Sequence, residues 1–392
     1  MKRCDLVIIG SGLAGLNLVK ALRKLGDQRP ITLFTQEAGH FYAKPMLSNA
    51  LGKGKTPANI PMQSMAAFAS EYQVDIQAAV TVSSVDVHAQ CVMVAGQAYS
   101  WRNLVLATGA RPCRLRDWGL AVEGTIHTVN QLSEYDDFYQ DLMRVKAEYP
   151  DRPARVLIVG SGLIGCEFAN DLAAQGIAVS MVDLADRPMA RLLPPELSNA
   201  LAAALTGLGV KGYWQERVVA IRQHDAEYQL NTASGLTLTA DLVLSAVGLM
   251  PQTALAASAG LACGPGIRVN RLLETSVSGV YALGDCATVE GLSLQYVLPL
   301  MACTRALANT LHGTPTPVTY PAMPVVVKTP ACPLVLCVPP NTSNTVWSVS
   351  GKDLDLKGLL HDASGQLVGF ALSGACVSEK HTLTSALPAL LS

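Results

Sequence analysis

Two short runs, residues 6–9 and 156–159, are entirely apolar, and a Gly-x-Gly-x-x-Gly motif follows each of them. Both runs are rich in β-branched residues, which predicts a buried strand. After each motif, apolar positions recur with a helical period, and a second apolar run then follows. We expect the helices at residues 16–24 and 166–175, and the second strands at residues 31–34 and 178–182. The chain therefore contains the strand–helix–strand unit of a dinucleotide-binding fold twice.

The pattern changes between and after these two units. Alternating polar and apolar residues predict antiparallel insertions at residues 74–99 and 210–250. Other apolar and helical patterns predict strands at 101–110 and 280–285 and helices at 133–149 and 298–311. Beyond a Pro-rich segment, strand-like runs and a short helix occupy residues 325–392. We therefore predict an α/β protein with two tandem Rossmann-like three-layer domains and a small α+β C-terminal domain.

The composition indicates a large folded core and excludes several partners. Of 392 residues, 50% are hydrophobic and 15% are charged, and the net charge is −1. This balance disfavours disorder and also a nucleic-acid partner, because proteins that bind polyanions carry a basic excess. No apolar stretch reaches the roughly 18–20 residues of a membrane helix. The ten cysteines occur singly, without a CxxC pair, so we expect them to be reduced and to form no metal site. We also expect a cytoplasmic protein and a monomer.

The glycines of the two motifs have distinct expected tasks. The first glycine of a motif permits a tight turn, the second lets the backbone approach a pyrophosphate, and the third lets the helix pack against the strand. Phosphates then bind at the helix N-terminus, where free N–H groups point at them. In chain order these tasks fall to Gly10, Gly12 and Gly15 in the first copy and to Gly160, Gly162 and Gly165 in the second.

An acid at the end of the second strand binds the adenosine ribose in such folds. The second copy has Asp183 at this place. Its carboxylate would accept from both ribose hydroxyls and repel a 2′-phosphate, so we expect NADH rather than NADPH here; an N-cap without a ligand role is the alternative. The first copy has Thr35 at the equivalent place and Glu37 two residues later. Glu37 either reaches the ribose or is an exposed loop acid.

Three further motifs resemble one family over residues 5–310. Ala-Thr-Gly109, Gly248-x-x-Pro251 and Tyr-Ala-Leu-Gly-Asp285 occur in the order typical of FAD-dependent pyridine-nucleotide reductases. The resemblance implies that the first copy binds FAD and that Asp285 contacts the ribityl chain of the flavin. It also implies a discontinuous FAD-binding domain at 1–115 and 248–322, an NADH-binding domain at 116–247 and a C-terminal cap at 323–392.

Longer segments narrow the resemblance to the bacterial rubredoxin–NAD(+) reductases of alkane-oxidising systems. These segments are Tyr42–Ser48, Gly162–Asp171, Tyr296–Arg305 and Val327–Pro333. The resemblance implies hydride transfer from NADH to FAD and then delivery of single electrons to rubredoxin, for an alkane hydroxylase or a similar system. The alternatives are a ferredoxin or flavorubredoxin reductase of the same fold, and a non-catalytic FAD/NAD redox sensor.

The same resemblance implies the site residues. Lys44 lies near the flavin, where its ammonium would stabilise the reduced ring, and Glu167 would pair with Lys44. Lys328 approaches the pyrimidine edge of the flavin. Each residue also has an alternative without a role in the site. Glu167 would be a carboxylate favoured by the helix dipole, Lys44 a solvated loop lysine and Lys328 a structural lysine. The implied FAD contacts are Gly10, Gly12, Ala14, Gly15, Thr35, Glu37, Lys44, Pro45, Val82, Ala107, Thr108, Gly109, Asp285, Val297 and Lys328. The implied NADH contacts are Gly160, Gly162, Leu163, Ile164, Gly165, Glu167, Asp183 and Gly248.

The placement of cysteines indicates where electrons go. Disulfide reductases and NADH peroxidases of this superfamily have a reactive cysteine soon after the first unit, and residues 36–60 contain none. Cys332 and Cys337 have the spacing of a redox pair but lie in an apolar run. Electrons must therefore leave for another molecule, and a direct NADH oxidase is disfavoured. Rubredoxins are small and acidic, so the candidate docking residues are the basic Lys53, Lys55 and Arg305.

Overall fold

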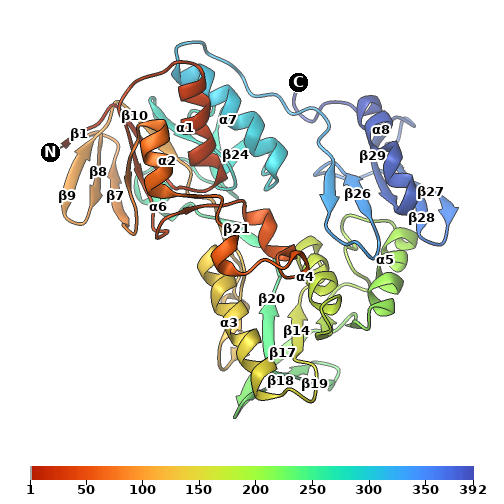
Figure 1. Ribbon diagram of the computed structural model, residues 1–392. Helices are drawn as coiled ribbons and strands as arrows, with labels where there is room; N and C mark the ends of the chain where they lie inside the picture. Colours follow the sequence, from red (N-terminus) through yellow and green to blue (C-terminus); the bar gives the residue numbers. More distant parts are fainter. Residues whose placement is uncertain (1) are drawn as a thin grey trace.

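The computed structural model describes residues 2–392, which form three lobes in contact (Figure 1). The first lobe contains a parallel five-stranded sheet with the order β23-β10-β2-β3-β6. Its strands are β2 (Leu6–Ile9), β3 (Ile31–Phe34), β6 (Asp75–Gln77), β10 (Asn103–Leu106) and β23 (Val280–Ala282). The helices α1 (Leu13–Lys24) and α7 (Val297–Leu311) lie side by side on this sheet.

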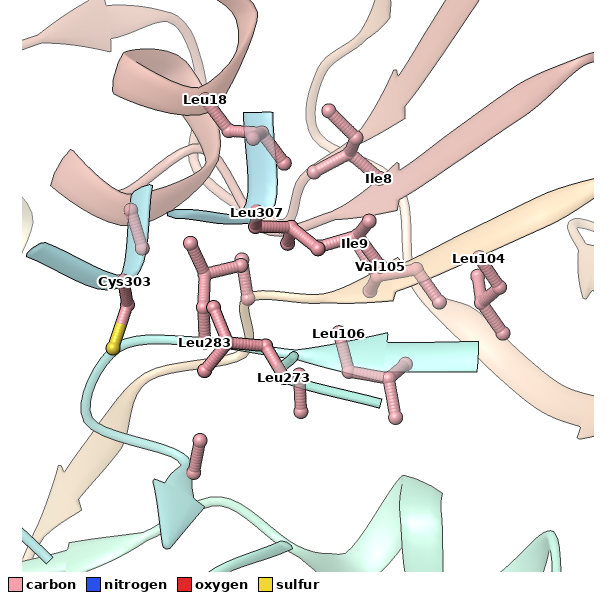
Figure 2. Close-up of a cluster of buried hydrophobic side chains, with 14 of the residues drawn as sticks. Ile8, Ile9, Leu18, Leu104, Val105, Leu106, Leu273, Leu283, Cys303 and Leu307 are labelled. Carbon is pink, nitrogen blue, oxygen red and sulfur yellow. The ribbon is translucent and has the colours of Figure 1, made fainter. Parts of the chain in front are cut away.

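The core of the first lobe lies between this sheet and the two helices. Leu18 of α1 and Leu307 of α7 gather with the strand residues Ile8, Ile9 and Val105 (Figure 2). All of these side chains are buried. The apolar runs therefore form strands because both of their faces are covered, as in other parallel sheets.

The second lobe repeats this arrangement with the sheet order β13-β20-β14-β15-β16, again parallel. Its strands are β13 (Ile126–His127), β14 (Arg155–Val159), β15 (Ala178–Val182), β16 (Lys211–Tyr213) and β20 (Leu242–Ser245). The helices of this lobe are α3 (Leu132–Glu148), α4 (Leu163–Ala173) and α5 (Pro195–Gly207). The prediction of a duplicated strand–helix–strand unit is confirmed.

Each of these two lobes also has an antiparallel meander. The first contains β7 (Val82–Asp86), β8 (Cys91–Val94) and β9 (Gln97–Ser100), with β1 (Lys2–Arg3) parallel to β9. The second contains β17 (Val218–His224), β18 (Glu227–Thr232) and β19 (Thr237–Ala240), with β12 (Ala121–Val122) parallel to β17.

The predicted extent of these meanders was wrong at three places. Strands β6, β16 and β20 were expected in the antiparallel insertions, but all three belong to the parallel sheets. Their partners come from distant parts of the chain, and a short apolar run does not indicate which partner it takes. The meanders are consequently shorter than the alternating pattern suggests.

The third lobe is a five-stranded sheet with the order β25-β26-β29-β28-β27, antiparallel throughout. Its strands are β25 (Val325–Val327), β26 (Leu334–Cys337), β27 (Val346–Lys352), β28 (Asp355–His361) and β29 (Leu367–Ser373). The 3-10 helix η5 (Gly374–Glu379) and the helix α8 (Lys380–Ala386) follow. Strand-like runs and a final short helix were expected here, and they are present.

Short elements lie outside the main sheets. The segment before the first meander contains β4 (His40–Phe41), η1 (Lys44–Asn49), η2 (Leu51–Lys53), η3 (Pro57–Asn59), β5 (Gln63–Ser64) and α2 (Met65–Tyr72). The others are β11 (Ala110–Pro112), η4 (Leu115–Trp118), β21 (Leu249–Pro251), α6 (Ala254–Ser258), β22 (Ile267–Val269) and β24 (Ala287–Val289). Strands β11 and β21 pair where the chain passes between the first and second lobes. Within residues 2–392, no helix has the length and apolar character needed to cross a membrane.

Candidate functional site: a two-nucleotide cleft

A cleft of about 2240 Å³ is lined by residues of all three lobes. Both glycine motifs face it, as do Lys44, Glu167 and Lys328. The site residues expected from the sequence line this cleft with only two exceptions, Gly15 and Gly165, which pack inside the lobes. The structure therefore brings the expected residues together around one space.

The first glycine motif has no room for side chains at two of its three glycines. A Cβ on Gly10 would lie 2.2 Å from the carbonyl oxygen of Ala107, and a Cβ on Gly15 would lie 2.0 Å from that of Gly10. Gly12 differs, because no atom lies within 4 Å of a Cβ placed there. The turn thus holds the strand close to α1 and leaves open space at the helix N-terminus, which fits a bound pyrophosphate.

The second glycine motif has the same geometry. A Cβ on Gly160 would lie 2.6 Å from the carbonyl oxygen of Ala246, and a Cβ on Gly165 would lie 2.1 Å from that of Gly160. The position of Gly162 is again open. A second phosphate-binding space therefore lies at the N-terminus of α4.

The residue that follows the second strand of each glycine unit differs between the two lobes. It is Asp183 after β15 and Thr35 after β3. In the second lobe, Asp183 Oδ2 accepts from the N–H of Ser161 at 2.5 Å and from its hydroxyl at 2.7 Å. In the first lobe the hydroxyls of Ser11 and Thr35 are 2.7 Å apart at the equivalent place. Asp183 Oδ1 also accepts from the N–H of Ala185 at 2.8 Å. A carboxylate has about four acceptor positions, so about one remains for a ribose hydroxyl. Thr35 carries no charge.

Glu37 belongs to the cleft and is not an isolated loop acid. Its N–H donates to the Thr35 hydroxyl at 3.1 Å, and its Oε1 lies 4.0 Å from Nζ of Lys44. Lys44 also acts on Asp285, since burial raises the pKa of Asp285 and the lysine opposes that rise. Lys44 therefore stands between two acids of the first nucleotide site.

Glu167 pairs with Lys328, so the expected pairing with Lys44 was wrong. Nζ of Lys328 lies 2.5 Å from Oε2 of Glu167, and the N–H of Lys328 donates to Oε1 at 2.9 Å. The hydroxyl of Ser48 donates to the same Oε2 at 2.5 Å. Glu167 is fully buried, so its charge needs these partners. Lys44 instead lies 4.0 Å from Glu37.

The polar face of α4 continues beyond Glu167. Asn170 Oδ1 accepts from the N–H of Ala331, and Asp171 accepts from the N–H groups of Leu51 at 3.1 Å and Gly52 at 3.0 Å. A Cβ on Gly52 would lie 2.4 Å from Oδ1 of Asp171, so this contact requires glycine. Burial raises the pKa of Asp171 to about 6, against the lowering effect of the two N–H groups. One helix thus joins the other two lobes.

Sequence reasoning missed the roles of Ser48, Asn170 and Asp171. All three lie in segments that were quoted for the family resemblance, but no local pattern assigns them a partner. Their spacing was the available signal. Glu167, Asn170 and Asp171 stand at i, i+3 and i+4, which places polar side chains on the buried face of a helix.

No cysteine is found among the described residues that line the cleft. Cys337 is buried at the end of β26, and Cys332 is buried just before that strand begins. Burial raises the pKa of Cys332 to about 11. A thiol in this state is a poor nucleophile. The candidate docking residues Lys53, Lys55 and Arg305 lie outside the cleft lining.

Comparisons with known proteins agree with this site. Residues 4–308 match the model of the pyridine nucleotide-disulphide oxidoreductase family. The chain belongs to this family. Residues 317–387 match a second model, described as the rubredoxin binding C-terminal domain. The family uses FAD and NADH, and the two glycine turns described above fit one nucleotide each.

Relatives align along nearly the whole chain. The rubredoxin-NAD(+) reductase of Alcanivorax borkumensis is 40% identical, with 98% of this chain and 99% of the relative covered. That of Acinetobacter baylyi is 39% identical, with 98% of each chain covered. The nitric oxide reductase FlRd-NAD(+) reductase of Aeromonas salmonicida is 37% identical, with 98% and 96% covered.

A solved structure has the same fold over both nucleotide-binding lobes and the C-terminal lobe. It is the ferredoxin reductase for the CYP199A2 system from Rhodopseudomonas palustris, with a TM-score of 0.85 and 26% identity. The alignment covers 98% of this chain and 95% of that one. The predicted fold class, two tandem Rossmann-like domains followed by a small α+β domain, is confirmed.

Proposed function

We propose that this protein oxidises NADH and delivers the electrons one at a time to rubredoxin. The observation that carries the proposal is the position of Lys328. It lies in the segment that matches a rubredoxin-binding domain, and it forms part of the wall of the two-nucleotide cleft. The surface for the acceptor and the site of hydride transfer are therefore adjacent.

The residues of the chain have the following proposed tasks. Hydride acceptance and one-electron release would be supplied by FAD when it is bound, and the chain would position the cofactor. Gly12 and Gly162 leave room for the two pyrophosphates, and Asp183 binds the NADH ribose. Lys44 and Lys328 bring positive charge to the flavin side of the cleft, where negative charge increases on reduction. Glu167 holds Lys328 in place.

Two types of acceptor are suggested by the relatives. The two rubredoxin reductases named above are 40% and 39% identical, whereas the flavorubredoxin reductase is 37% identical. We propose rubredoxin as the acceptor because the rubredoxin reductases have the higher identities. An alkane hydroxylase or a similar enzyme would then use the electrons that rubredoxin carries. The test is NADH-driven reduction of equal concentrations of a rubredoxin, a flavorubredoxin and a [2Fe–2S] ferredoxin. A higher kcat/KM for either of the last two acceptors would refute the choice.

A redox sensor with the same fold would bind both nucleotides without rapid turnover. Anaerobic stopped-flow mixing of the FAD-loaded protein with NADH distinguishes the two functions. An electron-transfer enzyme should bleach the flavin absorption within the turnover time and regain it when rubredoxin is added. A protein that stays reduced in the presence of oxidised rubredoxin would be a sensor.

We further propose that the lobes correspond to functional domains. Residues 1–115 and 248–322 would bind FAD, residues 116–247 would bind NADH, and residues 323–392 would contact the acceptor. The pairing of β11 with β21 supports boundaries near residues 115 and 248, because the chain passes between the lobes there. The ten free cysteines support a reducing compartment, the cytoplasm. Limited proteolysis with mass spectrometry would test the boundaries.

A further inference from the structure

Most of the large apolar side chains that remain exposed line the cleft. One group belongs to the third lobe and the start of α7. The other group surrounds the second glycine motif and consists of Trp118, Ile164, Leu184, Val219, Leu249 and Met250. Trp118 is 53% exposed although it is the largest side chain of the group. Concentrated apolar exposure in a concave site indicates a ligand surface.

The short helix η4 carries Leu115 and Trp118 at its two ends. Side chains three residues apart in a 3-10 helix lie on the same side, so Trp118 and Leu115 share one face. Leu115 is buried in the same apolar cluster as Val159, Val182 and Val247. Val182 immediately precedes Asp183. Trp118 itself is exposed and lines the cleft that Asp183 also lines.

Strand pairing gives an independent reason for this location. Strand β12 runs parallel to β17, with Ala121 opposite Ala220, and η4 ends three residues before that pair. The N–H of Glu216, just before β17, donates to the carbonyl oxygen of Asp183 at 2.9 Å. Trp118, Val219 and Leu184 come from three segments and line the same cleft as Asp183.

We propose that Trp118 stacks on the adenine ring of NADH and closes the outer end of the second nucleotide site. The ligand class is a purine nucleotide, recognised by its flat face. Asp183 would bind the ribose, and the purine attached to that ribose extends outward, where Trp118, Val219 and Leu184 offer apolar surface. The inference rests on the proposed function only in placing NADH in the second lobe.

The test compares ligands with and without adenosine on the FAD-loaded full-length protein. ADP-ribose contains the adenine, and nicotinamide mononucleotide lacks it. Their dissociation constants are measured by calorimetry for the unaltered protein, Trp118→Ala, Trp118→Phe and the control Met62→Ala. Met62 is 63% exposed and does not line the cleft.

We expect Trp118→Ala to weaken ADP-ribose about tenfold, a typical loss for one base-stacking aromatic. Trp118→Phe should restore most of the affinity, and Met62→Ala should match the unaltered protein. Nicotinamide mononucleotide should bind all four proteins equally. ADP-ribose should also quench the emission of Trp118, so Trp118→Phe should lose that part of the fluorescence change.

Two results would overturn the stacking. ADP-ribose affinity that is unchanged in Trp118→Ala removes the contact. Equal loss of both ligands in Trp118→Ala indicates a distorted site rather than a lost stack. If ADP-ribose does not bind the unaltered protein, the NADH site itself is wrong, and the stacking proposal is refuted with it. Loss of rubredoxin turnover with normal ADP-ribose binding would instead refute the proposed acceptor alone.

Discussion

Lys328 and Glu167 form an ion pair between the third lobe and the second, with Nζ 2.5 Å from Oε2. The carboxylate is fully buried, whereas the lysine side chain is 25% exposed. Removal of one partner from a buried pair leaves an unpaired charge, which costs more than the pair itself contributes. The free energy of unfolding should therefore fall more when only Lys328 is replaced than when both residues are replaced.

Lys328→Met should destabilise the protein by about 2–4 kcal/mol, since it leaves the Glu167 charge buried without a cation. Glu167→Gln should cost less, because the amide still accepts a hydrogen bond and the lysine end can reach water. The double variant should recover part of the stability lost in Lys328→Met. Urea unfolding of the three FAD-loaded variants measures this, and strictly additive losses would show that the pair is not coupled.

Asp183→Ala combined with Leu184→Arg should change the preferred nucleotide. The carboxylate that would repel a 2′-phosphate is removed, and an exposed position lining the cleft gains a cation. We expect kcat/KM for NADPH to rise and that for NADH to fall, each by at least about tenfold. Steady-state kinetics with both nucleotides give the ratio. Leu25→Arg, a matched change at another exposed leucine outside the cleft, should leave it unchanged.

Cys332→Ser with Cys337→Ser should leave electron transfer from NADH to rubredoxin within about twofold of the unaltered rate. Both thiols are buried, and neither lines the cleft. Burial also raises the pKa of Cys332 to about 11, which disfavours the reactive thiolate. Stopped-flow reduction of rubredoxin tests this. A folded double variant that has lost turnover would show that electrons pass through a disulfide.

Asp171 should make the protein lose stability as the pH rises. Burial raises its pKa to about 6, so between roughly pH 4 and 6 the folded state binds more protons than the unfolded state. The contribution of this group is therefore present at low pH and is lost as the pH rises through 6. Lys53 opposes the shift, and Glu167 adds to it.

The isosteric variant Asp171→Asn removes this titration. Relative to the unaltered protein, its free energy of unfolding should rise by roughly 1 kcal/mol between pH 5 and pH 7. Asp151→Asn, at an exposed turn, is the matched control. Urea unfolding at the two pH values measures the difference. A constant offset between Asp171→Asn and the unaltered protein would mean that Asp171 titrates normally.

The repeated glycine motifs were enough to predict the two dinucleotide-binding folds, whereas most of the cleft residues were implied by the family resemblance. Spacing alone located Asp183, and it also showed that the first copy has Thr35 instead of an acid at the equivalent place. Both positions follow from the end of the second strand. The pairing of Glu167 was not predictable, since Lys328 is 161 residues away and the lobe that carries it has no fixed place in the sequence pattern. Trp118 was missed because a four-residue 3-10 helix has no periodic signal.

The origin of Lys328 in the last lobe limits how such proteins can gain or lose domains. A chain that ended near residue 316 would keep both glycine turns and the six-residue segment of η1. It would nevertheless lose the Lys328 ammonium that pairs with Glu167 and the apolar side chains of the last lobe that share the core of the second lobe. A shortened descendant would need a cation from another segment or a neutral residue on α4. The terminal lobe is thus an electrostatic part of the nucleotide-binding body rather than a removable attachment.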